Sequence, residues 1–246
     1  MNQMLSRFSR LCLLAALSAV LLPTASAGDL SNLGALSASE FRTVSEDLAA
    51  AVSYKPIAPT EPQGITGFDL GVEVTGTDIS KSAAALRKAG ASDSPMDTLM
   101  TSRVHLHKGL PLGFDIAAYL GNVSAINVNL VGAELRYALL AGGLTTPAVG
   151  VRGTYTNMNG ANQLALSTRS LDVSVSKGFA MLTPYAGIGQ VWVDSSPSAG
   201  TLGQESFTLG KLFAGLNMNL GLLNLAFEAD RTGNTSSWGA KLSLRW

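Results

Sequence analysis

The stretch that decides the fold is "WGAKLSLRW", residues 238–246, in which apolar and polar side chains alternate without interruption. Successive side chains of a strand point to opposite faces, so the pattern predicts a strand with one apolar and one polar face. The printed sequence stops on the bulky Trp246, without the few polar residues that usually follow a last element. We therefore expect this strand to be the last one of a sheet.

The same period of two residues runs through the sequence from Gly64 onward. Most of the alternating segments are close to the length of a tilted strand that crosses a bilayer. They predict an all-β fold, a closed antiparallel up-and-down transmembrane β-barrel of about ten strands. The number would be eight if the weak segments 101–108 and 222–231 were not strands. The ten segments are 66–78, 101–108, 112–121, 127–139, 146–157, 165–176, 183–194, 205–219, 222–231 and 236–246.

The connections between these segments also alternate. Those after odd-numbered strands tend to be long and polar, such as 79–100, whereas those after even-numbered strands tend to be short, such as "GLP" at 109–111. Outer-membrane barrels have long extracellular loops and short periplasmic turns. We expect the N-terminus of the exported chain to start in the periplasm and the C-terminus to return there, which requires an even number of strands.

Residues 28–63 precede the barrel, which we assign to 64–246, and have a different pattern. Ser37 and Glu40 form an S-x-x-E capping box, with Leu36 and Phe41 placed as a hydrophobic staple. The segment predicts a short N-terminal amphipathic helix of about four turns, followed by a Pro-rich linker. Two positions remain open for this helix: it fills the lumen, or it lies against the periplasmic rim.

Residues 1–27 have the pattern of a cleaved signal peptide. Arg7 and Arg10 precede an apolar stretch, and an A-x-A cleavage motif follows at 25–27. Cleavage would remove Cys12, the only cysteine, so we expect no disulfide and no cysteine ligand. It would leave 15 basic against 17 acidic side chains, a net charge of −2. That balance gives no reason to expect nucleic-acid binding.

The segment 64–246 resembles the small outer-membrane β-barrel proteins of Gram-negative bacteria. Its last strand is similar to the C-terminal assembly signal of that group. The resemblance implies that the barrel-assembly machinery recognises this strand by strand pairing. It also implies a location in the cell outer membrane, in contact with membrane lipid and lipopolysaccharide. The residues that carry the signal are Ala240, Leu242, Leu244 and Trp246.

The inward face of the predicted barrel collects charges of both signs. A charge in a low-dielectric lumen is costly unless it is paired, so we expect a salt-bridged network that mostly fills the interior. Asp230 and Arg245 also lie on this inward face. The network comprises Asp69, Glu73, Arg103, His105, His107, Asp115, Glu134, Arg136, Arg152, Asp172, Glu228 and Lys241.

The outward face should carry aromatic side chains near both membrane interfaces. We expect one girdle at the short-turn rim and a second at the outer rim. The first would contain Tyr137, Phe179, Tyr185 and Trp246, and the second Tyr155 and Trp238.

The two histidines lie in "RVHLHK", where a spacing of two puts His105 and His107 on one strand face. Folding of the hairpin at "GLP" is expected to bring Asp115 opposite His105. The pair is either part of the polar lumen or two ligands of a metal ion. A metal site needs a third ligand that the sequence does not supply, so we expect no metal and no cofactor.

These observations leave three functional classes. The first is a structural or surface-interaction barrel that displays its loops. The second is a narrow channel for small solutes or ions. The third is an outer-membrane enzyme that hydrolyses lipids or peptides, for which we identify no catalytic residue, since no histidine can join Ser195 and Asp194. In the 79–100 loop, "SAAALRKAG" predicts a short helix, whose Arg87 and Lys88 either contact lipopolysaccharide phosphates or are simply solvated.

Overall fold

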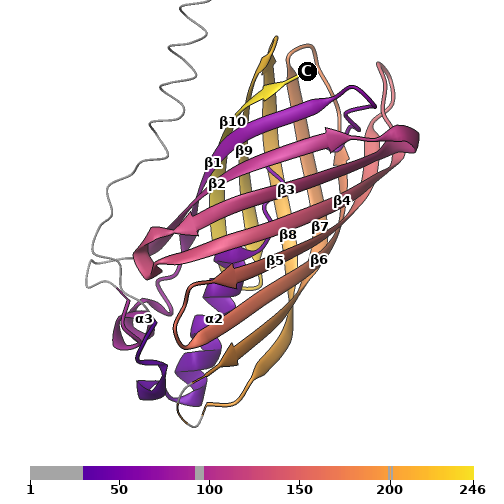
Figure 1. The fold of residues 1–246 in the computed structure, drawn as a ribbon. Coiled ribbons are helices and arrows are strands. Elements are labelled where there is room, and N and C mark those ends of the chain that lie inside the picture. Colours follow the sequence, from indigo (N-terminus) through magenta and orange to yellow (C-terminus); the bar gives the residue numbers. More distant parts are fainter. Residues whose placement is uncertain (1–29, 92–96, 199, 201) are drawn as a thin grey trace, which may run out of the picture.

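The structure, a computed structural model, describes residues 30–91, 97–198, 200 and 202–246. The predicted signal peptide, with Cys12, lies outside these residues. Within them, ten antiparallel strands close into one barrel in which each strand pairs with its neighbours in sequence (Figure 1). The up-and-down barrel is confirmed, and the eight-strand alternative is wrong. The strands are β1 Phe68–Asp78, β2 Thr98–Gly109, β3 Phe114–Val123, β4 Val128–Ala141, β5 Ala148–Asn159, β6 Leu164–Ser176, β7 Leu182–Pro197, β8 Glu205–Leu220, β9 Leu223–Thr232 and β10 Thr235–Arg245.

The barrel closes where β1 pairs with β10, in a register that runs from Asp69↔Arg245 to Thr77↔Ser237. Phe68 and Trp246 extend this seam through two backbone hydrogen bonds of 2.9 and 3.1 Å. Their rings stack with centroids 5.4 Å apart. No strand edge is left open along the seam, as a bilayer requires of a sheet that crosses it.

The two ends of the barrel differ, and we call them the turn end and the loop end. In Figure 1 the turn end is at the top, beside the C-terminus, and the loop end is at the bottom. The turn end has the short connection η2 (Pro111–Gly113), and the loop end has η3 (Ser124–Ile126) and α3 (Ala83–Lys88). The short helix expected in the loop after the first strand is thus present.

Strand β6 explains how the outer surface is divided. Its second half, Leu171–Ser176, turns Leu171, Val173 and Val175 outward and serines and Asp172 inward. Its first half has the opposite arrangement, because Leu164 and Leu166 are buried inside whereas Arg169 is exposed outside. The side chains alternate throughout, but the apolar face changes from the inside to the outside near Ser170.

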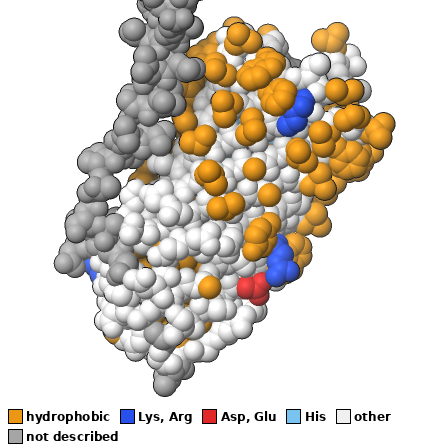
Figure 2. Space-filling model, in the orientation of Figure 1, with side chains coloured by type: hydrophobic (Ala, Val, Ile, Leu, Met, Phe, Trp, Pro, Cys, Tyr) orange, Lys and Arg blue, Asp and Glu red, His pale blue; other side chains and the backbone are white. Residues whose placement is uncertain are grey.

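Other strands invert in the same way. On β4, buried Leu130 lies next to exposed Asn129, and on β7 buried Val193 lies next to Asp194. We call the turn-end part of the wall, apolar outside and charged inside, the belt. We call the loop-end part, polar outside and apolar inside, the collar. Figure 2 shows hydrophobic side chains gathered over the upper part of the visible face and few at the loop end.

Helix α2 (Ala38–Val52) lies inside the collar. It starts with the expected capping box, in which the Ser37 side chain and Glu40 satisfy each other's backbone N–H. The hydrogen bond from the Ser37 backbone to its carboxylate lowers the pKa of Glu40 to about 2, with a further contribution from Lys88. The helix buries Phe41, Val44 and Leu48 against inward side chains of the collar.

The four-turn helix is therefore confirmed, and the alternative that it lies against the periplasmic rim is wrong. Contacts with the loop end fix its position, because Arg42 pairs with Glu205 at the start of β8 and Lys88 of α3 pairs with Glu40. The apolar interior of the collar accounts for this: a helix with an apolar stripe is buried there and would be exposed at a polar rim. Among the described residues, no helix is long and apolar enough to cross a membrane.

Residues 53–63 run from the C-terminus of α2 through the belt to the turn end, where the chain enters β1. Eleven extended residues span at most about 36 Å, enough to cross the belt. We call residues 30–63, helix and linker together, the plug. Leu30 lies at the loop end in the apolar cluster with α2 and α3. The plug therefore crosses the barrel before β1 begins.

Leu48→Glu should release α2 from the collar. Leu48 is fully buried in the apolar cluster, so the change loses about 2–5 kcal/mol of packing and buries an unpaired carboxylate. We expect trypsin to cleave after Arg42 in the folded variant but not in the wild type, as read by mass spectrometry. Ser39→Glu, at an exposed position of the first helical turn, is the control. Equal protection of both variants would contradict the packing of α2 in the collar.

Candidate functional site

The lumen of the belt is the candidate site, and the structure places the predicted polar network there. Every member points inward from its strand and is buried. The network residues are Asp69, Glu73, Arg103, His105, His107, Asp115, Glu134, Arg136, Arg152, Asp172, Glu228 and Lys241. They come from β1–β6, β9 and β10, so the closed barrel brings together residues that are far apart in the sequence.

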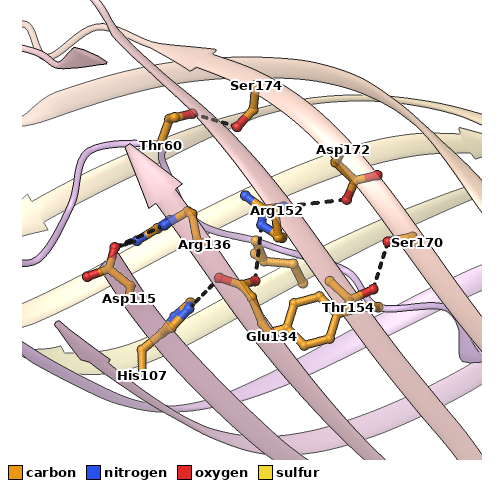
Figure 3. A network of polar contacts seen from close by, with 12 residues as sticks. Thr60, His107, Asp115, Glu134, Arg136, Arg152, Thr154, Ser170, Asp172 and Ser174 are labelled. Atoms are coloured by element: carbon orange, nitrogen blue, oxygen red, sulfur yellow. Dashed lines mark hydrogen bonds and ion pairs between the residues drawn. The ribbon is translucent and has the colours of Figure 1, made fainter. Parts of the chain in front are cut away.

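One group of charges crosses the wall from β2 to β8, and its members on β2, β4, β5 and β6 are labelled in Figure 3. His107 binds Glu134 at 2.8 Å, and Arg152 lies 3.1 Å from the other oxygen of the same carboxylate. Asp172 lies 3.8 Å from Arg152 and 3.4 Å from Lys211. Cations and carboxylates alternate along this row, so each buried charge has a partner of opposite sign.

A second group lies at the seam. Lys241 contacts Asp69 at 3.1 Å, and Arg103 contacts Glu73 at 3.1 Å. His105 lies between the two carboxylates, 3.5 Å from each. The histidine therefore bridges an ion pair between β1 and β10 and an ion pair between β1 and β2.

The expected pairing of Asp115 with His105 is wrong. The turn after β2 is formed by Leu112 and Gly113, both at positive φ, and it pairs Asp115 with Gly109. His105 instead faces Tyr119 across the hairpin. Asp115 forms a two-contact ion pair with Arg136, at 2.6 and 3.1 Å, on the next strand.

The wall also binds the end of α2. Arg103 donates to the carbonyls of Ala51 and Ser53 at 3.0 and 3.4 Å. The Tyr119 hydroxyl donates to Val52 at 3.3 Å, and Lys211 donates to Tyr54 at 2.8 Å. The last carbonyls of a helix lack partners within the helix and carry partial negative charge. Two buried cations and a phenol of the barrel wall supply those partners.

Beyond the C-terminus of α2, toward the turn end, carboxylates of β9 bind the linker. Lys55 forms an ion pair of 2.8 Å with Asp230. The backbone N–H of Ile57 donates to Glu228 at 3.0 Å. Both carboxylates therefore have their partners in the plug.

Polar side chains of β3, β4 and β6 hold the remainder of the linker. Thr60 contacts Ser174 and Ser176 at 2.9 Å each. Arg136 donates to the carbonyl of Pro59 at 2.7 Å. Gln63 donates its N–H to Asp115 at 3.1 Å. The network thus binds the backbone of the chain's own linker as well as itself.

Two members of this site were missed by the sequence analysis. Lys211 points inward from β8, and the alternation of residues 205–219 already places it on the inward face. Lys55 lies in the Pro-rich linker, where a lysine is normally solvated, and no local pattern indicates its burial. Inside the collar, Ser45 and Asp47 of α2 likewise bind Ser195 at 2.8 Å and Thr235 at 2.6 Å.

The aromatic residues correct one further expectation. Tyr137, Phe179 and Trp246 near the turn end, and Tyr155 and Trp238 farther along, are exposed on the outer surface. Tyr185, expected in the turn-end girdle, is only 4% exposed and points into the lumen. Gly215 on β8 leaves room for its ring, since a Cβ there would lie 2.3 Å from the Tyr185 ring.

The described residues contain no group of three or more His, Cys, Asp or Glu side chains that could hold a metal ion. A shallow groove of about 470 Å³ lies at the loop end of β1, β2 and β10. Its lining contains carboxylates, hydroxyls and an indole but no histidine. The lining residues are Asp78, Ser80, Asp97, Thr98, Ser236, Ser237 and Trp238.

A closed antiparallel barrel with an apolar outer belt and a charged interior is the architecture of integral outer-membrane β-barrel proteins, and this chain has that fold. No protein-family model matches it, and no curated protein matches its sequence.

Among solved structures, it is similar to the KdgM porin in complex with disordered oligogalacturonate, at 8% identity and a TM-score of 0.38 over 72% of this chain and 98% of that chain. It is similar to the translocator domain of autotransporter NalP from Neisseria meningitidis, at 10% and 0.38 over 85% and 95%. It is also similar to the outer membrane protein Omp33 of Acinetobacter baumannii, at 6% and 0.32 over 77% and 100%. Values this low carry no functional argument.

Lys55→Met should destabilise the protein far more than loss of a surface ion pair. Lys55 and Asp230 are 1% and 3% exposed, and removal of the lysine leaves a buried carboxylate unpaired, which costs about 3–5 kcal/mol. The matched control is Arg169→Met, since Arg169 and Asp194 are 64% and 37% exposed. It should cost less than about 1 kcal/mol. Urea unfolding in detergent micelles measures both.

The double variant Lys55→Met/Asp230→Asn is expected to recover most of the lost stability, because the second change removes the stranded charge. If the single variants at Lys55 and Arg169 were equally stable, the linker would not be bound by the wall as the structure describes.

Proposed function

We propose that this protein is a closed outer-membrane barrel, filled by its own N-terminal plug, that serves a structural or surface-interaction role through its loop end. The observation that carries the proposal is the set of hydrogen bonds from the belt wall to the backbone of residues 51–63. Three buried cationic groups use plug carbonyls as acceptors, and two carboxylates accept from the plug.

The distribution of the plug supports this reading over an open channel. Helix α2 occupies the collar and the linker occupies the belt, so both parts of the lumen contain ordered chain. A conducting lumen would need its wall charges in contact with water, whereas here they contact each other and the linker. A narrow channel for small solutes or ions is the alternative that the experiment below separates from this proposal.

We propose no catalytic role. His105 and His107 are bound to carboxylates within the belt lumen. The Ser195 hydroxyl is buried in the collar against Ser45. Neither Ser195 nor the two histidines therefore have the partner that hydrolysis of a lipid or peptide bond would require.

Conductance tests the plug. We expect wild-type protein in planar bilayers to be silent and a variant lacking residues 30–60 to show discrete openings. A second variant, Ser45→Cys/Ser195→Cys, joins α2 to β7, because the two hydroxyl oxygens lie 2.8 Å apart. It is made in a Cys12→Ala background. Any openings of the reduced form should disappear on oxidation, because the disulfide holds the helix in the collar.

Arg87→Ala, at an exposed position of α3 next to Lys88, is the control and should remain silent. Steady openings of the wild type that persist in the oxidised variant would favour the narrow channel and reject the closed barrel.

We also propose that the barrel-assembly machinery recognises β10 through Ala240, Leu242, Leu244 and Trp246, and that the belt contacts membrane lipid and lipopolysaccharide. Support comes from the seam, where these residues lie on the outer face of the strand that pairs with β1. Trp246 adds a ring contact with Phe68 at the closing point.

Trp246→Ala should lower the amount of inserted barrel in cells several-fold, measured as the heat-modifiable band in outer-membrane fractions. Trp238→Ala is the control, because Trp238 is also exposed on the outer face of β10 but lies far from the end of the strand. Folding of both purified variants into detergent should be similar. A loss of folding in detergent as well would assign Trp246 to stability and not to recognition.

A further inference from the structure

The path of the plug fixes which side of the membrane receives the N-terminal end of the described chain. Leu30 and Leu33 are buried at the loop end, where the backbone N–H of Leu33 donates to the side-chain oxygen of Gln163 in the β5–β6 loop at 2.9 Å. Asn32 is bonded to Ala89 and Lys88 beside α3. The first described residues are therefore attached to three different parts of the loop end.

The other end of the plug lies at the turn end. Gly67 accepts a backbone hydrogen bond of 3.1 Å from Gly109, the last residue of β2 before its short turn. Between these two ends, Lys55, Ile57 and Thr60 are bonded to the belt wall. The segment thus passes through the whole barrel, and its direction is from loop end to turn end.

The outer surface gives the barrel its orientation in the membrane. The C-terminal end of β10 lies on one side of the belt, and the collar, with the two longest connections of the barrel (79–97 and 198–204), lies on the other. In outer-membrane barrels the short turns are periplasmic and the longer loops are extracellular. The collar, polar outside and apolar inside, has the surface of a domain that projects into water.

We infer that the N-terminal end of the described chain, at Leu30, lies on the extracellular side of the membrane. The inference rests on the proposed closed barrel and adds the topology of that barrel. The elements placed on that side are η1 (Leu33–Ala35), the first turn of α2 and α3, together with the Lys88–Glu40 and Arg42–Glu205 ion pairs.

The physical basis is the cost of the opposite arrangement. If the N-terminal end were withdrawn to the turn end, Arg103 and Lys211 would lose the helix carbonyls that they bind. The apolar interior of the collar, including Leu130, Leu166 and Met158, would then face water. Exposure of these apolar side chains to water is unfavourable, so the collar alone favours the threaded arrangement.

Cysteine labelling of intact cells tests the inference. In full-length protein with Cys12→Ala, single cysteines are introduced as Ser31→Cys in the plug, Ser124→Cys in a loop and Leu144→Cys in a turn, all at exposed positions. A membrane-impermeant maleimide should react with the first two on intact cells. Leu144→Cys should react only after lysis. Ser39→Cys replaces Ser31→Cys if the latter does not fold.

Failure of the plug cysteine to react on intact cells, whatever happens at Ser124→Cys, would overturn the inference. Reaction of Leu144→Cys on intact cells would also overturn it, because the barrel would then be inserted in the opposite direction. Either labelling result would leave the proposed closed barrel untouched. The closed barrel is tested by conductance, and conductance does not depend on which side of the membrane the cysteines face.

Discussion

The structure depends on the pairing between the charged wall of the belt and the linker that passes through it. Arg103, Arg136 and Lys211 are buried cations that would be costly in a low-dielectric lumen without acceptors. Extended backbone in the same place would be costly without donors. The wall cations donate hydrogen bonds to the linker carbonyls, and Lys55 of the linker is the cation that pairs with Asp230 of the wall. Each of these cations also pairs with a wall carboxylate, and the linker carbonyls accept from the donors that these ion pairs leave over.

A second constraint acts along the axis of the barrel. A strand that crosses a bilayer must be apolar outside, whereas a strand that continues into water must be polar outside. In β6 the apolar positions shift from Leu164 and Leu166 on the inside to Val173 and Val175 on the outside. The inversion gives the collar an apolar interior that is buried by α2, and it gives the belt a polar interior that is filled by the linker.

The sequence determines much of this through its period. Ten alternating segments predicted the strands, and the capping box at Ser37 predicted the start of α2. The inward charges also followed from alternation. Alternation alone does not distinguish the two faces of a strand that inverts, so the collar was not predicted. The register of the β2–β3 hairpin depends on backbone angles at Leu112 and Gly113, and those angles shift the partner of Asp115 by several residues.

The path of the plug could not be predicted either, because it depends on contacts between distant residues. In the sequence Lys55 looks like a solvated lysine at the start of a Pro-rich linker, and only the fold shows that β9 places Asp230 beside it. Glu228 has the Ile57 N–H as its donor only if the linker is threaded. Since these partners belong to the plug, the barrel wall contains charges that are balanced only in the assembled protein. The contacts of these charges with the plug therefore also record the direction in which the chain passes through the barrel.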